Sequence, residues 1–190
     1  MDLQLLYHAK PFFGGISKSV NFPDDTPVWA YSDAAWADQH DRKSTGGMFL
    51  FFNGSAIMWW CRTLQTVALS SQDSEFMTLS DSSRELVFLQ NLLCSVGYLT
   101  KDVSAQLFGD NRGSITLANT PGDHQKSKHL DVRYFYVRQK IDDGRLEVKW
   151  VPTTHQLADL LTKALLTFVV MGHQQIDATF TAQFAPLHFE

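Results

Sequence analysis

The run Val28-Trp29-Ala30-Tyr31-Ser32-Asp33 decides the interpretation of this chain, because an apolar, aromatic segment ends here on a carboxylate. Such a composition is typical of a buried strand. Two similar runs follow at residues 47–52 and 55–61, separated by Asn53-Gly54, a two-residue hairpin signal. The three runs predict antiparallel strands, the last two joined by a tight turn, with Asp33 at the end of the first.

The rest of the chain alternates helices with strands. A long helix is expected from a cap within Ser70-Ser71-Gln72-Asp73 to Gly97, because apolar residues recur there at helical spacing. Strands are expected at 103–108 and 146–151, and shorter helices at 114–118, 130–141 and 155–166. This order predicts an α/β domain with a mixed sheet, three antiparallel strands and then two parallel ones, flanked by helices.

The domain is expected to cover residues 27–166. Residues 1–26 are poorly patterned and are punctuated by glycines and prolines, so they are interpreted as a connector or N-terminal arm. Residues 167–190 show no clear period and are expected to form a C-terminal tail, with an extra strand through 176–180 as the alternative.

Composition is that of an ordinary globular protein of 190 residues with a net charge of -4, so no overall basic field attracts nucleic acid. Charge is uneven, however, and half of the basic residues lie in one stretch: Arg112, Lys126, Lys128, Arg133, Arg138, Lys140, Arg145 and Lys149. Two cysteines predict free thiols rather than a disulfide framework. With no secretory signal and no apolar run of about 20 residues, we expect an intracellular protein, in the cytoplasm or nucleus, without membrane contact.

Four acidic residues stand where a fold could fix their direction. Asp33 and Asp110 follow strands, Glu75 lies early in the long helix, and Asp159 lies in the last helix. Gathered carboxylates make an all-oxygen site for hard cations such as Mg²⁺. Two such ions about 3.5–4 Å apart can drive phosphodiester cleavage. The alternative for each acid alone is a capping or solvated residue, and Asp73 competes with Glu75 as the helix acid.

Six motifs surround these acids in order. They are Tyr31-Ser32-Asp33-Ala34-Ala35-Trp36-Ala37, Asp41-Arg42-Lys43-Ser44-Thr45-Gly46-Gly47, Thr66-Val67-Ala68-Leu69-Ser70-Ser71 through Glu75-Phe76, Gly109-Asp110-Asn111-Arg112-Gly113-Ser114-Ile115, Lys128-His129-Leu130-Asp131-Val132-Arg133-Tyr134, and Val151-Pro152 with Gln156-Leu157-Ala158-Asp159-Leu160-Leu161-Thr162-Lys163. Together, from about residue 28 to 164, they resemble the ribonuclease H domain of copia-type retrotransposon polyproteins. The segment before residue 28 resembles the connector that follows the reverse transcriptase domain in such polyproteins.

The resemblance implies a ribonuclease H fold, with a five-stranded mixed sheet, and cleavage of the RNA strand of RNA–DNA hybrids with two Mg²⁺ or Mn²⁺ ions. It assigns catalysis and metal binding to the four acids: Asp33, Glu75, Asp110 and Asp159. A reverse transcriptase domain is a candidate partner. Residues expected to contact nucleic acid are Asn111, Lys126, Lys128, His129 and Arg133.

Two departures from the family pattern bear on substrate affinity. The stretch Arg62-Thr63-Leu64-Gln65 stands where the family often has a Lys-Lys-Gln-like sequence, and Phe135 stands where it often has His. One alternative function is a nucleic-acid-binding or structural module without cleavage that needs a reverse transcriptase partner. Another is an integrase-type core, whose acids would run Asp, Asp, Glu, whereas the glutamate here comes second.

Overall fold

The computed structural model describes residues 26–120 and 128–163, and for residues 128–131 it describes the backbone alone. Residues 23–163 form one compact unit. The expected N-terminal arm, apart from Thr26, the expected tail and its alternative strand at 176–180 lie outside the described residues, so the domain boundaries at 27 and 166 stay a prediction.

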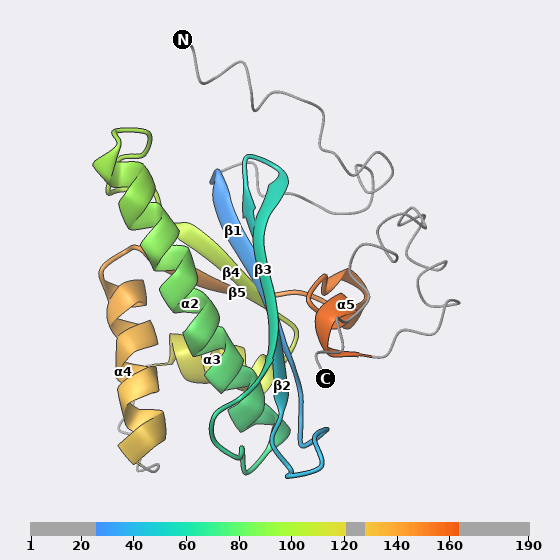
Figure 1. The fold of residues 1–190 in the computed structure, drawn as a ribbon. Coiled ribbons are helices and arrows are strands. Elements are labelled where there is room, and N and C mark those ends of the chain that lie inside the picture. The colour runs from blue at the N-terminus through green and yellow to red at the C-terminus, as the bar shows by residue number, and fades with distance from the viewer. Residues whose placement is uncertain (1–25, 121–127, 164–190) are drawn as a thin grey trace, which may run out of the picture. The chain divides into compact units, whose positions relative to one another are not determined.

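Five strands form a single mixed sheet in the order β3-β2-β1-β4-β5 (Figure 1). The strands are β1 (Val28–Ala35), β2 (Thr45–Phe52), β3 (Ser55–Thr63), β4 (Ala105–Gly109) and β5 (Leu146–Trp150). β2 is antiparallel to both β1 and β3, while β4 is parallel to both β1 and β5. The predicted fold class is therefore confirmed. Strand β1 runs two residues beyond Asp33 and pairs with β2 as far as Ala35.

The turn between β2 and β3 is the predicted two-residue hairpin. Asn53 and Gly54 both have positive φ, 48° and 82°, as a type I′ turn requires. The register of the two strands shifts between Leu50 and Phe51, which marks a β-bulge. The hairpin brings β3 back beside β2 and sets the edge of the sheet.

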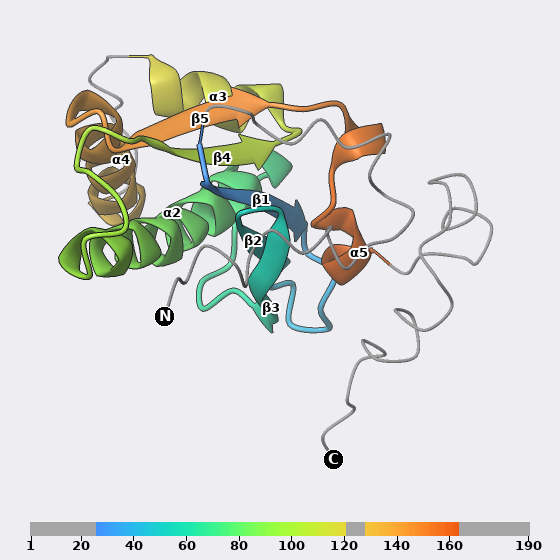
Figure 2. The same cartoon turned by 90° about the horizontal axis from the view of Figure 1, so that it is seen from above.

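Three helices pack on one side of the sheet: α2 (Ser71–Ser95), α3 (Arg112–Asn119) and α4 (Lys128–Asp142) (Figure 2). The predicted start of α2 is confirmed, since the Ser70 side chain accepts a hydrogen bond from the Asp73 backbone N–H at 3.1 Å. None of the helices in the described residues is long and apolar enough to cross a membrane.

The helix predicted at residues 155–166 is wrong in its extent. A 3₁₀ turn, η2 (Thr153–His155), is followed by the short helix α5 (Asp159–Thr162). Between them the Gln156 side chain donates to Ser32 O at 2.9 Å and accepts from the Ala158 backbone N–H at 3.3 Å. These contacts tie the chain to β1 and interrupt the helix just before Asp159.

The core fills the space between the sheet and α2. Val28 and Ala30 of β1 and Met48 and Leu50 of β2 alternate inward with period two. They pack on one apolar stripe of α2, formed by Phe76, Leu79 and Leu86. The opposite face of the sheet carries aromatic pairs, Trp29 stacked on Phe51 at 5.7 Å and Tyr31 stacked on Phe108 at 5.1 Å between ring centroids.

Two adjacent glycines in β2 let a helix approach each face of the sheet. A Cβ atom at Gly46 would lie 2.6 Å from Thr78 Oγ1 of α2. A Cβ atom at Gly47 would lie 2.9 Å from both Leu161 Cβ and Thr162 Cγ2 of α5. Because neighbouring strand residues point to opposite faces, α2 and α5 flank the sheet on opposite sides.

We predict that Gly46→Ala lowers the free energy of unfolding by about 1–3 kcal/mol, because the added methyl overpacks a filled interface. Thr78 cannot move aside freely, since it is buried and its hydroxyl donates to Ser74 O at 3.0 Å. Urea unfolding measures the change. Thr63→Ala, at the exposed end of β3, is the control and should change stability by less than about 0.5 kcal/mol. Equal midpoints for Gly46→Ala and the wild type would contradict the close packing.

Candidate metal centre

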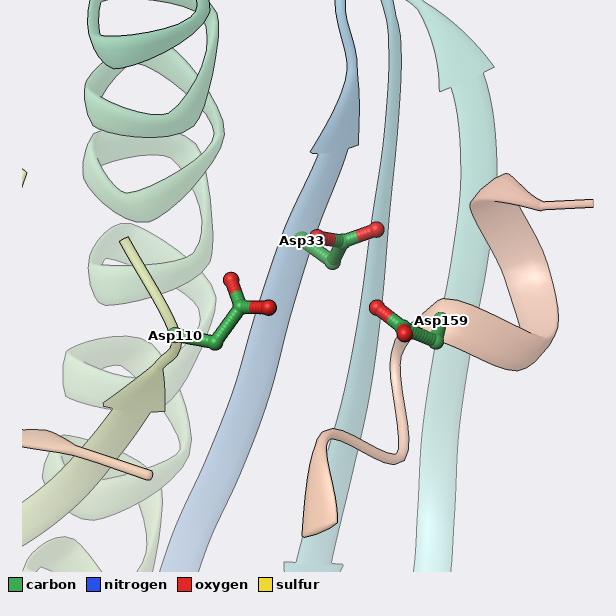
Figure 3. Close-up of side chains that lie close together, drawn as sticks. All are labelled: Asp33, Asp110 and Asp159. Atoms are coloured by element: carbon green, nitrogen blue, oxygen red, sulfur yellow. The ribbon is translucent and has the colours of Figure 1, made fainter. Parts of the chain in front are cut away.

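Three aspartates from different elements meet at one edge of the sheet. Asp33 lies near the end of β1, Asp110 directly follows β4, and Asp159 opens α5. One carboxylate oxygen of each lies within 4.8 Å of the others (Figure 3). β1 and β4 are parallel neighbours, so their carboxyl ends lie side by side. The hydrogen bond from Gln156 to Ser32 O holds the segment before α5 against β1.

Glu75 of α2 joins this cluster. It is only 8% exposed, and its pKa is raised to about 9 by burial, by the charges of Asp33 and Asp110, and by a hydrogen bond with Asp33. Asp73, the competing acid, lies in the first turn of α2, where its backbone N–H donates to the capping Ser70. The structure thus brings together all four acids that the sequence selected.

Lys163 is the one basic side chain, within the described residues, that pairs with these acids. Its Nζ lies 2.7 Å from Asp159 Oδ1 and 3.9 Å from Asp33 Oδ1. Burial alone would lower the pKa of Lys163, but the bond to Asp159 and the charges of Asp33, Asp159 and Asp110 raise it. The pKa of Asp159 is raised to about 6, by burial first and then by Asp33 and Asp110, against the opposing effect of Lys163.

Hydroxyl groups orient the aspartates. Thr162 Oγ1 of α5 donates to Asp33 Oδ2, and Thr153 Oγ1 of η2 donates to Asp110 Oδ2 at 2.7 Å. Trp150 Nε1 donates to the backbone carbonyl of Asp110 at 2.8 Å and fixes the end of β4. These contacts supply the outer support that a metal site needs for its carboxylate ligands.

The residues present fit a divalent cation. Four carboxylates face one lysine, so the site carries an excess of negative charge at neutral pH that protons on the acids only partly relieve. All the donor atoms are carboxylate oxygens, the ligands that Mg²⁺ and Mn²⁺ prefer. Asp33, Glu75, Asp110 and Asp159 could therefore hold such ions.

Two of the residues predicted to contact nucleic acid bond to other parts of the protein. Asn111 caps α3, since its Oδ1 accepts from the Ser114 backbone N–H at 3.0 Å. Arg133 of α4 contacts α2, where its guanidinium lies 3.3 Å from Asp81 Oδ1 and donates to Met77 O at 3.1 Å. A phosphate contact by either residue stays a prediction. Three further predicted residues have side chains outside the described part of the chain: Lys126, Lys128 and His129.

Reasoning from the sequence did not assign roles to Gly47, Thr162 or Lys163. The signal for Gly47 was available, because a glycine inside a strand marks a close approach of another segment. Thr162 and Lys163 lie three and four residues after Asp159, so a helix there places all three side chains on the same face. Their contacts with Asp33 on β1 depend on tertiary structure.

The chain is 33% identical over 142 residues to the retrovirus-related Pol polyprotein from transposon TNT 1-94 of Nicotiana tabacum, which covers 74% of this chain. It is 35% identical over 138 residues, 72% of its length, to the Pol polyprotein from transposon RE1 of Arabidopsis thaliana. The chain is a homologue of copia-type retrotransposon Pol polyproteins. It spans only 10% and 9% of these two relatives, and no protein-family model matches it.

Solved structures establish the ribonuclease H fold of this Pol homologue. LC11-RNase H1, isolated from compost by a metagenomic approach, superposes with a TM-score of 0.55 at 11% identity, covering 77% of this chain and 99% of that one. The same enzyme in complex with an RNA/DNA hybrid gives a TM-score of 0.51 at 12% identity, covering 75% of this chain and 99% of that one. The predicted resemblance to a retrotransposon ribonuclease H domain is confirmed.

The raised pKa of Glu75 predicts how the stability of the cation-free protein depends on pH. Its pKa is about 9 in the folded state against an ordinary 4.5, so the folded protein keeps a proton that the unfolded chain has lost. Because the unfolded state binds fewer protons in this range, the free energy of unfolding falls as pH rises. The range from pH 6 to pH 9 starts at the raised pKa of Asp159, about 6, so that Glu75 dominates the effect within it. In this range the melting temperature in EDTA should fall more steeply for the wild type than for Glu75→Gln. Parallel melting curves for the two proteins would show that Glu75 is not held protonated.

Gly47 predicts a separate effect on the metal centre. A methyl group there would push α5, and with it Asp159, away from Asp33. We expect Gly47→Ala to weaken Mn²⁺ binding by about tenfold or more, as loss of a supporting contact does at other metal sites. Calorimetric titration of Mn²⁺ measures this, with Thr63→Ala, at the exposed end of β3, as the control that should bind Mn²⁺ like the wild type. Equal Mn²⁺ affinity in the two variants would contradict a role for Gly47 in seating α5.

Proposed function

We propose that this domain is a metal-dependent endonuclease that hydrolyses the RNA strand of RNA–DNA hybrids. The observation that carries the proposal is the convergence of Asp33, Glu75, Asp110 and Asp159 at one edge of a ribonuclease H sheet. The homology to Pol polyproteins supports it, since the four acids lie inside the motifs that resemble the ribonuclease H domain of that family.

The four carboxylates would hold two Mg²⁺ or Mn²⁺ ions. Such ions supply an activated water and a stabilised departing 3′ oxygen when bound. The protein's own residues prepare the site for this chemistry. Thr162 and Thr153 aim the carboxylates of Asp33 and Asp110, and Lys163 offsets part of their negative charge. Glu75 keeps a proton at neutral pH and must release it to act as a ligand.

An RNA–DNA hybrid is the substrate that the comparisons favour. LC11-RNase H1, which shares the fold, has been crystallised with an RNA/DNA hybrid. A protein distinguishes a hybrid by 2′-hydroxyl contacts and groove shape, and basic side chains position it through phosphates without reading sequence. Lys128 and His129, at the start of α4, are proposed to contact the phosphates of the hybrid.

A second candidate function is a nucleic-acid-binding or structural module that depends on a reverse transcriptase partner. The net charge of -4 and the engagement of Arg133 with Asp81 favour weak binding of hybrid by the domain alone. The match with this chain also covers only 10% and 9% of the two relatives' own length.

The decisive experiment is cleavage of an end-labelled RNA–DNA hybrid with Mg²⁺ or Mn²⁺. The wild type should cut only the RNA strand of the hybrid, and should leave duplex RNA and duplex DNA intact. Asp110→Asn should reduce cleavage by more than about 100-fold, since loss of a ligand exceeds the loss of a supporting contact. Asp102→Asn, which makes the same change in an exposed turn after α2, is the matched control and should cleave like the wild type.

Four outcomes separate the candidates. Loss of cleavage in Asp110→Asn alone supports the enzyme. A folded wild type that binds Mn²⁺ but cleaves only after a reverse transcriptase domain is added is a nuclease that depends on its partner. One that binds Mn²⁺ and does not cleave even then supports the non-catalytic module. A wild type that neither binds Mn²⁺ nor cleaves overturns the catalytic proposal.

A further inference from the structure

An arginine and a tryptophan form a fixed pair beside Asp110. The Arg112 guanidinium lies over the Trp150 ring, 4.1 Å from its centroid, well within the range of a cation–π contact. The same indole donates through Nε1 to the backbone carbonyl of Asp110 at 2.8 Å. Trp150 ends β5 and Arg112 opens α3, which packs beside β5 (Figure 2). The pair is therefore tied to the strand end that carries one of the metal-centre acids.

The charge of Arg112 has no acidic partner within the described residues. Its side chain is exposed, it lies two residues from Asp110, and yet it forms no ion pair with the acids of the metal centre. Four other described arginines pair with carboxylates: Arg62, Arg84 and Arg133 with Asp81, and Arg138 with Asp142. Arg145 instead bonds to the side-chain amides of Gln90 and Asn91. The stacking contact with Trp150 is the one that positions Arg112.

Stacking leaves the hydrogen-bonding edge of a guanidinium free. The five N–H donors of arginine lie in the plane of the group, and that edge matches the oxygens of a phosphate. Trp150, 41% exposed, holds this plane in place, so less side-chain entropy is lost when an anion binds. An anionic group that reaches the metal centre would meet this unpaired cation beside it.

We propose that Arg112, positioned by Trp150, binds a backbone phosphate of the nucleic acid next to the one that is cleaved. The inference rests on the proposed function, because a polyanion must approach the metal centre. It adds a substrate contact that does not hold metal. Arg112 is the binding residue, and Trp150 is a positioning residue that acts through it.

Binding of a fluorescent RNA–DNA hybrid, measured by anisotropy in EDTA, tests Arg112 without hydrolysis. Arg112→Ala should weaken binding about tenfold, the value of one charge-assisted hydrogen-bonded contact. The slope of log affinity against log salt, from about 50 to about 200 mM, should fall by about 0.7–0.9, as expected for one lost phosphate contact. Lys101→Ala removes the same charge from an exposed turn before β4, whereas Asp110 follows the other end of that strand, and should bind like the wild type.

Trp150 is tested through its coupling to Arg112. Trp150→Phe keeps an aromatic ring and should bind hybrid within about twofold of the wild type, whereas Trp150→Ala should lose about as much affinity as Arg112→Ala. The double variant should be no weaker than either single variant, because both changes remove one contact. In cleavage assays Arg112→Ala should raise KM more than it lowers kcat.

The outcomes distinguish this inference from the proposed function. If the wild type binds and cleaves hybrid while Arg112→Ala keeps its affinity and salt slope, the phosphate contact is wrong and the nuclease stands. If Trp150→Ala and Arg112→Ala lose affinity additively, Trp150 does not act through Arg112. If the wild type neither binds nor cleaves hybrid, with or without a reverse transcriptase domain, both proposals are overturned together.

Discussion

Repulsion among four carboxylates is the constraint on which the rest of this structure depends. Asp33, Glu75, Asp110 and Asp159 come from four elements and share one small site. Like charges at such distances oppose folding unless protons, a counter-ion or a bound cation neutralise them. The fold resists this repulsion through the paired sheet, the core beneath α2, and the close seating of α5 on Gly47. Repulsion among the carboxylates thus lowers the free energy of unfolding, and packing in the core offsets it.

Local pattern was enough to predict the sheet, and the family motifs were needed to select the four acids. The strands have period-two or continuous apolar runs, the hairpin has Asn53-Gly54, and α2 has a serine cap, and each signal acts over a few residues. Strands β4 and β5 and helices α3 and α4 lie within two residues of the expected bounds. The choice of Glu75 over Asp73 came from the family motif, and the burial of Glu75 agrees with it.

Features that depend on tertiary contacts could not be predicted in the same way. The helix expected at 155–166 is broken because Gln156 bonds to Ser32, which is 124 residues away in sequence. The engagement of Arg133 with Asp81 requires the packing of α4 on α2. The link from Lys163 to Asp33 joins α5 to β1 across the site. In each case a polar side chain bonds to a residue on another element, and only the folded chain brings the two residues within reach.

Proton release on cation binding tests the central claim most directly. Mg²⁺ would be titrated into the protein at about pH 8 by calorimetry in two buffers of different ionisation enthalpy. Because Glu75 has a pKa of about 9 without a cation, binding should release about one proton per protein molecule, and Glu75→Gln should release almost none. Binding without proton release in the wild type, or no binding of Mg²⁺, would contradict a site in which repelling carboxylates are held together for a divalent cation.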